Sequence, residues 1–249
     1  MIDVNWSLGI RNSLPPPPSP NLFAPPPGGA FVKMKFPELI PAKFLRRLNR
    51  FVGEVSVEGR RVFAHIRNTG RLTELLKPGN TVFLKEKNSG KYPFEVLLVD
   101  VGSSLVCIDS TITPKLYAEF LNLPVRFEPK FGEHRFDLMY DNRVVETKSV
   151  NLVENGVALF PDAPTVRGRK HIQKLIELSE QGFEPQLIFV VQREDALVFS
   201  PNYKVDKPFS EAVQEFYSRG LTVKAFLCNV SLREISISRE IEVIFLKDG

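Results

Sequence analysis

The stretch FDLMYDNRVVETKSV, residues 136–150, decides how the carboxy-terminal half of the chain folds. Two short apolar runs, residues 136–140 and 144–150, flank the pair Asp141-Asn142. Asp and Asn tolerate a positive φ and form the local side-chain hydrogen bonds that tight turns need. The stretch therefore predicts a β-hairpin.

Strand geometry brings three ionisable side chains of this hairpin together. Side chains two residues apart on a strand point to the same face, so Glu146 and Lys148 share a face and Thr147 points away from it. If the two runs pair across the Asp-Asn turn, Asp137 lies beside that face at the open end, within reach of Glu146. Two carboxylates and one ammonium group then converge.

This group of charges suits phosphodiester chemistry. Mg²⁺ prefers oxygen ligands and is typically held by one or two carboxylates together with phosphate oxygens of the substrate. Bound metal polarises the phosphoryl group and activates a coordinated water, and Lys148 is placed to orient that water or to neutralise developing charge. An ordinary surface hairpin with a Glu146–Lys148 ion pair is the alternative.

The composition is that of a soluble globular protein, with 43% hydrophobic and 25% charged residues in a chain of 249. That length allows one large or two ordinary domains. No apolar run approaches the roughly 18 residues that span a bilayer, and the amino terminus does not resemble a secretory signal, so we expect a cytoplasmic protein. Cys107 and Cys228 lack neighbours at metal-ligand spacing and are expected to be buried in the core.

The net charge of +4 is unevenly distributed. Residues 34–110 carry 13 Lys and Arg against 8 Asp and Glu, a balance of +5, whereas residues 111–249 carry 18 against 20, a balance of −2. The bias is sharpest in residues 43–71, which hold Lys43, Arg46, Arg47, Arg50, Arg60, Arg61, Arg67 and Arg71 against Glu54 and Glu58. A basic segment of this kind suits a polyanionic partner.

The first two segments of the chain differ sharply in pattern. Residues 1–33 include PPPP and PPPGG, which fix φ without a packable pattern, so we expect a disordered or polyproline-like tail. Because the foldable pattern starts at Met34, we also expect translation of the native chain to begin near that residue.

Residues 34–110 predict an OB-like β-barrel, a fold that often binds nucleic acid on one sheet face. Its expected strands cover residues 44–57 with a bend at Gly53, 61–67, 81–87, 93–100 and 105–108, and a short helix covers 72–76.

Basic and aromatic side chains are interleaved in the OB-like segment. Arg46, Arg47 and Arg50 lie beside Phe44 and Phe51. Cations hold phosphates while aromatic rings stack on bases, so we predict a nucleic-acid-binding face here, with some of the phenylalanines belonging to the core. A barrel whose basic residues are merely solvated is the alternative.

Residues 111–249 mix strands and helices, which predicts an α/β domain. Helices are expected over residues 111–122, with Thr113 as the N-cap and Pro114 in the first turn, over 166–180 after Pro164-Thr165, and over 207–219. Strands are expected at residues 125–127, in the two arms of the hairpin, and at 157–160, 186–192, 197–199 and 222–228. The second helix begins with Arg167, Arg169, Lys170 and His171, whose charges oppose the helix dipole unless an anionic ligand lies there.

The chain resembles the sugar fermentation stimulation protein family over most of residues 40–230. The amino-terminal half carries RRLNRF (46–51), His65, Asn68-Thr69-Gly70 and LLKPG (75–79). The carboxy-terminal half carries Asp137, ETKSV (146–150), FPDA (160–163), Thr165, Arg167-Gly168 and Lys170-His171. The second set of motifs is the more distinctive.

The resemblance implies a mixed α+β chain, in which an OB-like barrel precedes a restriction-endonuclease-like α/β domain, with DNA binding as the family activity. In such nuclease-like domains an acidic residue and a following Glu-x-Lys bind Mg²⁺ or Mn²⁺ and position water. These roles fall on Asp137, Glu146 and Lys148, and Glu119 matches a helix acid that supplies an outer metal contact. Ile66 and Arg67 replace a usual Cys-Pro, and Thr147 replaces a small aliphatic residue.

Two hypotheses follow. In the first, the chain is a DNA-binding protein and a metal-dependent deoxyribonuclease; in the second, it is a non-catalytic DNA-binding regulator of sugar metabolism genes that keeps the nuclease-like domain as a scaffold. No phosphate-binding glycine loop or nucleophile elbow supports a sugar or small-molecule enzyme. The residues expected to contact DNA are Arg46, Arg47, Arg50, Arg67, Asn68, Thr69, Arg71, Arg167, Lys170 and His171, with a packing role as the alternative for the last two. The metal, the preferred DNA structure and the oligomeric state, a homodimer included, stay open.

Overall fold

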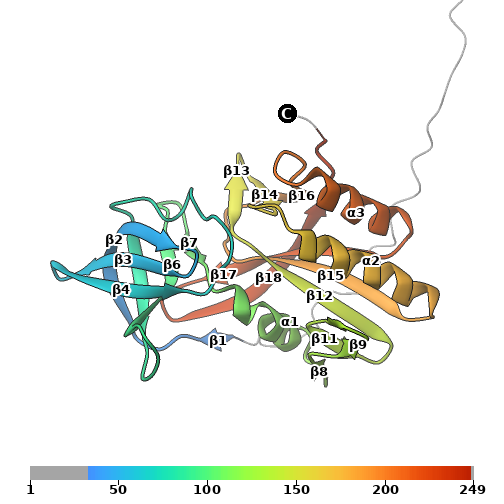
Figure 1. Cartoon of the computed structure of the whole chain (residues 1–249), viewed down its shortest axis with the longest axis horizontal. Coiled ribbons are helices and arrows are strands. Elements are labelled where there is room, and N and C mark those ends of the chain that lie inside the picture. The colour runs from blue at the N-terminus through green and yellow to red at the C-terminus, as the bar shows by residue number, and fades with distance from the viewer. Residues whose placement is uncertain (1–32, 248–249) are drawn as a thin grey trace, which may run out of the picture. The chain divides into compact units, whose positions relative to one another are not determined.

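The structure is a computed structural model that describes residues 33–247. The proline-rich segment that predicts a tail lies outside the described residues, apart from Lys33. Residues 33–247 fall within one compact unit and contain two large β-sheets, the second flanked by helices (Figure 1). In this part of the chain no helix combines the length and the apolar character needed to cross a membrane.

The amino-terminal sheet is a closed barrel of five strands with a sixth strand added. Its strands are β2 (Leu39–Asn49), β3 (Val52–Val57), β4 (Arg60–Ile66), β5 (Thr81–Glu86), β6 (Phe94–Asp100) and β7 (Leu105–Cys107). They follow the order β4-β3-β2-β5-β6-β7, and parallel pairing of β4 with β6 closes the barrel. Phe44, Val55, Ile66, Leu84 and Val96 fill its interior. The prediction of an OB-like barrel is confirmed.

Two details of the predicted barrel are wrong. Residues 44–57 do not form one bent strand, because the chain turns at Arg50 and Phe51 and separates β2 from β3, which pair antiparallel. Gly53 is the second residue of β3, where the ring of Phe44 approaches so closely that a Cβ would lie 2.8 Å from its Cε2 atom. Residues 72–76 form a turn rather than a helix, with Leu72 in the left-handed region at φ 51°.

The carboxy-terminal sheet is mixed and lies between helices. Its main strands are β11 (Leu138–Tyr140), β12 (Arg143–Val150), β14 (Val157–Phe160), β15 (Glu184–Val191), β16 (Val198–Pro201), β17 (Thr222–Val230) and β18 (Glu234–Val243). Three short strands bring this sheet to ten strands: β1 (Met34–Lys35), β8 (Arg126–Phe127) and β13 (Leu152–Glu154). A separate two-stranded sheet pairs β9 (Lys130–Phe131) with β10 (His134–Arg135). The order is β13-β14-β16-β18-β17-β15-β12-β11-β8, with β1 beside β18.

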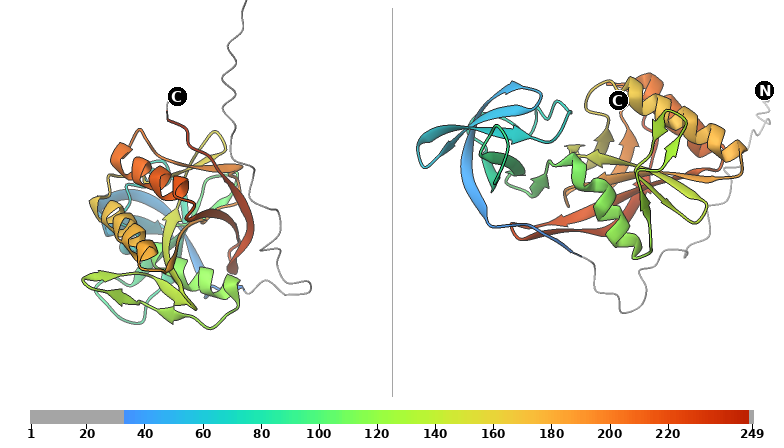
Figure 2. Two further views of the ribbon diagram at one scale, coloured as in Figure 1. Left: turned by 90° about the vertical axis from the view of Figure 1, so that its right-hand side faces the viewer. Right: turned by 60° about the horizontal axis from the view of Figure 1, so that its bottom comes forward.

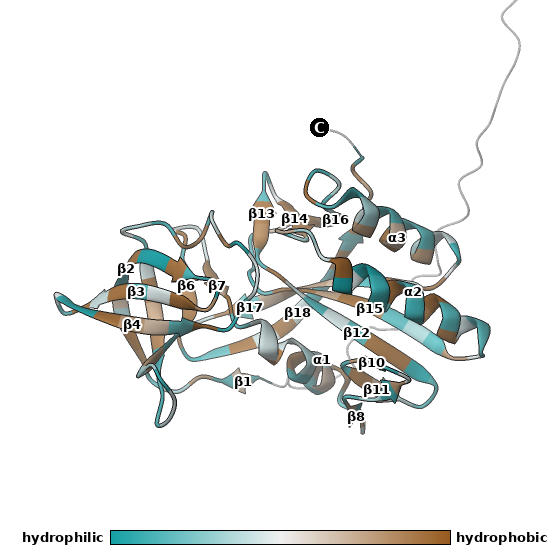
Figure 3. Ribbon diagram, viewed as in Figure 1, coloured by the Kyte–Doolittle hydropathy of each residue, from teal (hydrophilic) through white to brown (hydrophobic). Residues whose placement is uncertain are grey.

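Helices cover both faces of this sheet. Helices α2 (Val166–Glu180) and α3 (Lys207–Ser218) pack side by side on one face, whereas α1 (Thr113–Leu121), entered through the 3-10 turn η1 (Ser110–Ile112), packs on the other (Figure 2). Hydrophobic and hydrophilic residues alternate along α2 and α3 (Figure 3), as expected for helices with one buried face. The predicted α/β architecture is confirmed. Thr165, which precedes α2 as predicted, is its N-cap. The prediction of Thr113 as the N-cap of α1 is wrong, because the preceding 3-10 turn puts Ile112 in the cap position and Thr113 in the first turn of the helix.

The sequence pattern missed one long strand. Strand β18 pairs antiparallel with β17 and buries Ile235, Ile237 and Ile241. Charged residues such as Arg239 and Glu240 interrupt its apolar positions, and the register shifts at Leu227 and Cys228 of β17. Both cysteines are free and buried, as predicted.

Candidate metal centre and nucleic-acid interface

The predicted hairpin is present, and its longer arm is an inner strand of the sheet. β11 and β12 pair antiparallel with Leu138 opposite Val145, and the turn residue Asp141 has a φ of 45°. On its other edge β12 runs parallel to β15, whose buried apolar side chains make it a central strand. Burial on both sides fixes the register of β12 and therefore the direction of Glu146.

Glu146 is the most constrained acid of the site. Its side chain is 5% exposed. Oε1 accepts a hydrogen bond from Nζ of Lys148 and lies 2.6 Å from Nδ1 of His171. Among the described residues, Oε2 is buried without a hydrogen-bond partner. Burial opposes ionisation of Glu146, but the charge of Lys148 and the bond to His171 together hold its pKa below the usual range.

Asp137 lies beside Glu146, but it is held by Thr147, which the strand pattern places on the opposite face of β12 from Glu146. Its Oδ2 accepts hydrogen bonds of 2.7 Å from both the backbone nitrogen and the hydroxyl of Thr147. The expectation that Thr147 points away from the site therefore fails for Asp137, because both the backbone nitrogen and the hydroxyl of Thr147 bind the Asp137 carboxylate. Burial, followed by the negative charge of Glu146, raises the pKa of Asp137 to about 6 against the opposing effect of Lys148.

His171 joins the first turns of α2 to this pair of strands. It is buried, its ring packs edge-on against Phe136 and His134, and Nε of Arg167 lies 3.4 Å from its Nε2. Its Nδ1 is engaged by Glu146, so a packing and positioning role fits it better than direct phosphate contact. Sequence spacing did not identify His134, because its place here depends on the small β9–β10 hairpin.

Glu119 is on α1, as predicted, and its Oε2 is buried with no hydrogen-bond partner among the described residues. Burial raises its pKa against the opposing charge of Lys115 on the same helix. Across residues 33–247 no three His, Cys, Asp or Glu side chains are gathered as a metal-binding group. Glu119 is therefore not joined to Asp137 and Glu146 in one ligand cluster in this arrangement.

The chemistry of Asp137 and Glu146 nevertheless fits a hard divalent cation. The buried carboxylate of Glu146 and the half-buried carboxylate of Asp137 lie close enough for the charge of the first to raise the pKa of the second. Oε2 of Glu146 has its lone pairs unused by protein donors. A cation would remove the repulsion and supply the missing partner, and Mg²⁺ sites commonly use only one or two carboxylates with the rest of the shell from water and phosphate.

The basic residues of the barrel divide into structural and exposed groups. Arg47 donates hydrogen bonds to the carbonyl oxygens of Asn49, Arg50, Asn68, Gly70 and Arg71, so its guanidinium is used within the protein. Burial lowers the pKa of Arg47. Nε of Arg46 donates to Glu54 over 2.7 Å while most of its side chain stays exposed. Arg50, Thr69 and Arg71 are exposed. Arg47 is therefore a poor candidate for DNA contact.

Two sequence motifs meet where the barrel joins the α/β sheet. Asn68 donates to the Ile108 carbonyl oxygen and to Oδ1 of Asn151, the residue that follows β12. Gly70 packs against the carboxylate of Asp162, whose Oδ2 also accepts from the Leu72 backbone nitrogen at 3.1 Å. The Asn-Thr-Gly and Phe-Pro-Asp-Ala motifs therefore have a structural task at this junction, and Asn68, being buried, is not free to contact DNA.

The charged residues at the start of α2 are more accessible. Arg167 and Lys170 are exposed and Arg169 is half-buried. Thr165 caps the helix by accepting from the Gly168 nitrogen. Because α2 also carries His171, these cations lie on the same helix that holds Glu146 in place.

Comparison with known proteins gives a consistent result. Residues 45–108 match the model described as SfsA N-terminal OB domain, and residues 107–234 match that of the sugar fermentation stimulation protein RE domain. A sugar fermentation stimulation protein homolog of Aquifex aeolicus is 51% identical over 217 residues, covering 85% of this chain and 100% of the relative. A homolog of Carboxydothermus hydrogenoformans is 40% identical and covers 82% of this chain and 96% of its own.

A solved structure shares the fold. The structure of Pyrococcus furiosus SfsA in complex with Ca²⁺ superposes with a TM-score of 0.79 at 32% sequence identity, covering 85% of this chain and 98% of the other. Together with the two matched domain models and the curated relatives, this result places the chain: it belongs to the sugar fermentation stimulation protein family.

Proposed function

We propose that the chain binds DNA and hydrolyses its phosphodiester bonds with the help of a divalent cation, Mg²⁺ or Mn²⁺, at Asp137 and Glu146. The observation that carries this proposal is that the two carboxylate oxygens of Glu146 have different surroundings. Oε1 is held by Lys148 and His171, whereas Oε2 is buried with no hydrogen-bond partner among the described residues. A buried carboxylate oxygen without a hydrogen-bond donor lowers the stability of the folded chain, because the oxygen has lost its water and gained no partner. A cation is the partner that this oxygen lacks.

Each residue of the centre has a distinct task in the proposed reaction. Asp137 and Glu146 hold the cation, which when bound polarises the phosphate and increases the acidity of its water. Lys148 lies where it offsets negative charge that develops on the phosphate during attack. His171 and Thr147 fix the orientations of Glu146 and Asp137. That a solved relative was obtained in complex with Ca²⁺, a hard cation with the same preference for oxygen, supports the proposal.

DNA is the proposed substrate because exposed cations accompany this centre. The first two turns of α2 present Arg167 and Lys170, and the barrel presents Arg46, Arg50 and Arg71. Contacts to phosphate are made mainly by such side chains and fix the position of the nucleic acid. Because affinity of this kind depends on counterion release, binding is expected to weaken steeply as salt is raised.

The test is a cleavage assay of the purified protein on single-stranded, duplex and branched DNA, with and without Mn²⁺. We expect cleavage of at least one form, dependent on metal and lost in Glu146→Gln. Glu154→Gln changes an exposed acid on β13 and serves as the matched control. Metal-independent binding without cleavage of any form would contradict the nuclease proposal and favour the non-catalytic regulator.

A further inference from the structure

The outward face of β4 alternates cations with aromatic rings. Val62, Ala64 and Ile66 point into the barrel core. Successive side chains on a strand point to opposite faces, so Arg61, Phe63, His65 and Arg67 point outward together. We call these four residues the β4 face. Its side chains are exposed or half-exposed, whereas Ala64 and Ile66 are buried.

Phe63 is the apolar centre of the β4 face. It is 46% exposed, and Phe51 at the β2–β3 turn is 48% exposed. Phe63 lies opposite Glu54 in the register of β3 and β4, and Glu54 is already neutralised by Arg46 from β2. The acid beside the ring therefore does not repel a polyanion as a free carboxylate would.

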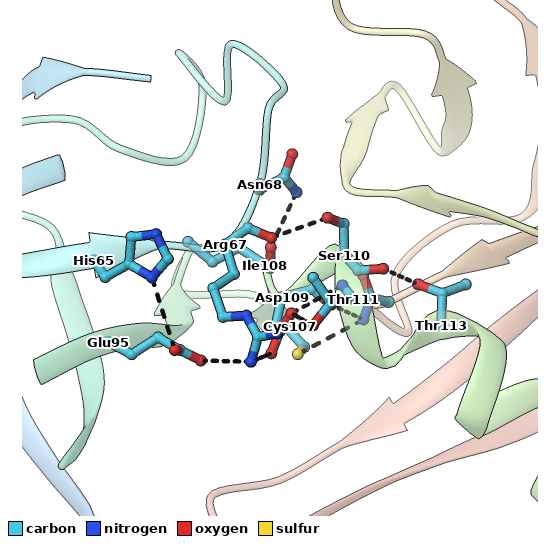
Figure 4. Close-up of polar contacts among 11 residues, drawn as sticks. His65, Arg67, Asn68, Glu95, Cys107, Ile108, Asp109, Ser110, Thr111 and Thr113 are labelled. Atoms are coloured by element: carbon cyan, nitrogen blue, oxygen red, sulfur yellow. Dashed lines mark hydrogen bonds and ion pairs between the residues drawn. The ribbon is translucent and has the colours of Figure 1, made fainter. Parts of the chain in front are cut away.

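Arg67 is held on the same face by two buried acids. Its Nη1 lies 3.9 Å from Oε1 of Glu95 and 3.9 Å from Oδ2 of Asp109, and Nδ1 of His65 lies 4.0 Å from Oε2 of Glu95 (Figure 4). These distances exceed a hydrogen bond. Within the described part of the chain the Arg67 guanidinium makes ion pairs but no hydrogen bond, so its donors remain able to meet a phosphate.

The end of the β4 face is tied to the metal centre strand. Asn68, next to Arg67, donates to Asn151, which lies three residues beyond Lys148. Three residues of strand span about 10 Å. The Arg67 end of β4 is therefore fixed beside the end of the strand that carries Glu146 and Lys148.

We propose that the β4 face binds an unpaired DNA strand, with a base stacked on Phe63 and phosphates held by Arg61 and Arg67. Aromatic rings between cations are the arrangement that holds single strands without sequence preference. In a duplex the bases are already stacked on one another, so they offer no free base face to stack on the Phe63 ring. This inference rests on the proposed function and names the DNA form that the protein prefers.

The experiment measures equilibrium binding by fluorescence anisotropy, without divalent metal, on a labelled single strand and on a duplex of the same length. The full chain is compared with Phe63→Ala and with Phe127→Ala, a control ring of similar exposure at 47% on β8. Loss of one stacking contact is expected to weaken single-strand binding about 5- to 100-fold in Phe63→Ala. Duplex binding and the control are expected to be unchanged.

A second variant reports contact directly. In Phe63→Trp the indole fluorescence is expected to fall when the single strand is added, whereas Phe127→Trp is expected to show no such change. Wild-type affinity in Phe63→Ala, equal losses in Phe127→Ala, or tighter binding of duplex than of single strand would overturn the inference. Those outcomes leave metal-dependent cleavage untouched, whereas failure of the wild-type chain to bind any DNA would overturn the proposed function itself.

Discussion

Glu146 divides its two carboxylate oxygens between two tasks. One oxygen is fixed by Lys148 and His171, and the other is buried with no donor among the described residues. Fixing one oxygen orients the other, which is how residues outside the direct ligand set tune a metal site. His171 therefore acts through Glu146 as a positioning residue rather than on the substrate.

Replacing His171 with Ala is expected to weaken Mn²⁺ binding and to lower cleavage, each by about 10- to 100-fold, because Glu146 loses the bond that fixes it. His171→Gln keeps a nitrogen donor and is expected to recover part of both. Isothermal titration with Mn²⁺ gives the affinity independently of turnover. Wild-type metal affinity in His171→Ala would show that Glu146 does not need this bond.

Glu95 predicts a pH dependence of stability that is separate from the metal centre. Burial, and then the charge of Asp109, raise its pKa above the usual value. A carboxyl whose pKa is higher in the folded than in the unfolded chain binds its proton more tightly when folded, so its contribution to stability falls as pH rises through that interval. Glu95→Gln cannot ionise, so it avoids this loss of stability at higher pH.

We therefore expect Glu95→Gln to have a higher free energy of unfolding than the wild type at pH 7. The difference is expected to shrink as pH falls from the raised pKa towards the ordinary pKa of Glu, about 4.3, and to be absent below it. Urea unfolding at several pH values measures it. A variant that is less stable than the wild type at neutral pH, with the deficit growing as pH rises, would contradict the sign.

At the scale of single elements, the hairpin and α2 were the easiest parts to predict. The Asp-Asn turn between two apolar runs and the apolar stripe of residues 166–180 are local signals, and the structure has the turn and the helix where they were expected. Residues 44–57 were predicted as one strand because the turn at Arg50 and Phe51 contains no glycine or proline to mark it. Arg47 binds carbonyl oxygens of that turn and also those of residues 68–71, and sequence spacing does not reveal the second set of bonds.

Arg47→Ala is expected to destabilise the barrel by about 2–4 kcal/mol, because several carbonyl oxygens lose a charged donor at once. Arg47→Lys is expected to recover little, since one ammonium cannot reproduce the planar set of donors. Thermal unfolding with Arg50→Ala as the exposed control measures the effect. A destabilisation no larger than that of the control would mean that Arg47 is free to serve as a DNA contact.

For the whole molecule, the least predictable feature is the junction between the barrel and the α/β sheet. It depends on residues far apart in the chain, such as Asn68 with Asn151 and Gly70 with Asp162. The family resemblance identified these motifs but suggested DNA contact for Asn68, whereas its side chain is buried at the junction. Strand periodicity indicated the pairing of Asp137 with Glu146, yet the bonds from Thr147 to Asp137 required the folded sheet.

Gly70→Ala tests this junction, because a Cβ at that position overlaps the carboxylate oxygens of Asp162, with Oδ1 only 2.7 Å away. We expect a loss of about 1–3 kcal/mol in stability. In the double variant with Asp162→Ala the clash is removed, so the combined loss is expected to be smaller than the sum of the single losses. Additive losses in the double-mutant cycle would show that the two residues do not interact.

The central claim is that Lys148 and the two carboxylates form a working centre for DNA hydrolysis. Its most direct test is single-turnover cleavage, with Mn²⁺, of a DNA form that the wild type cleaves, by the wild type and by Lys148→Ala, together with DNA affinity measured in the same buffer without metal. We expect the cleavage rate of Lys148→Ala to fall about 10²- to 10³-fold, with affinity unchanged within about threefold. Full cleavage by Lys148→Ala would contradict the account.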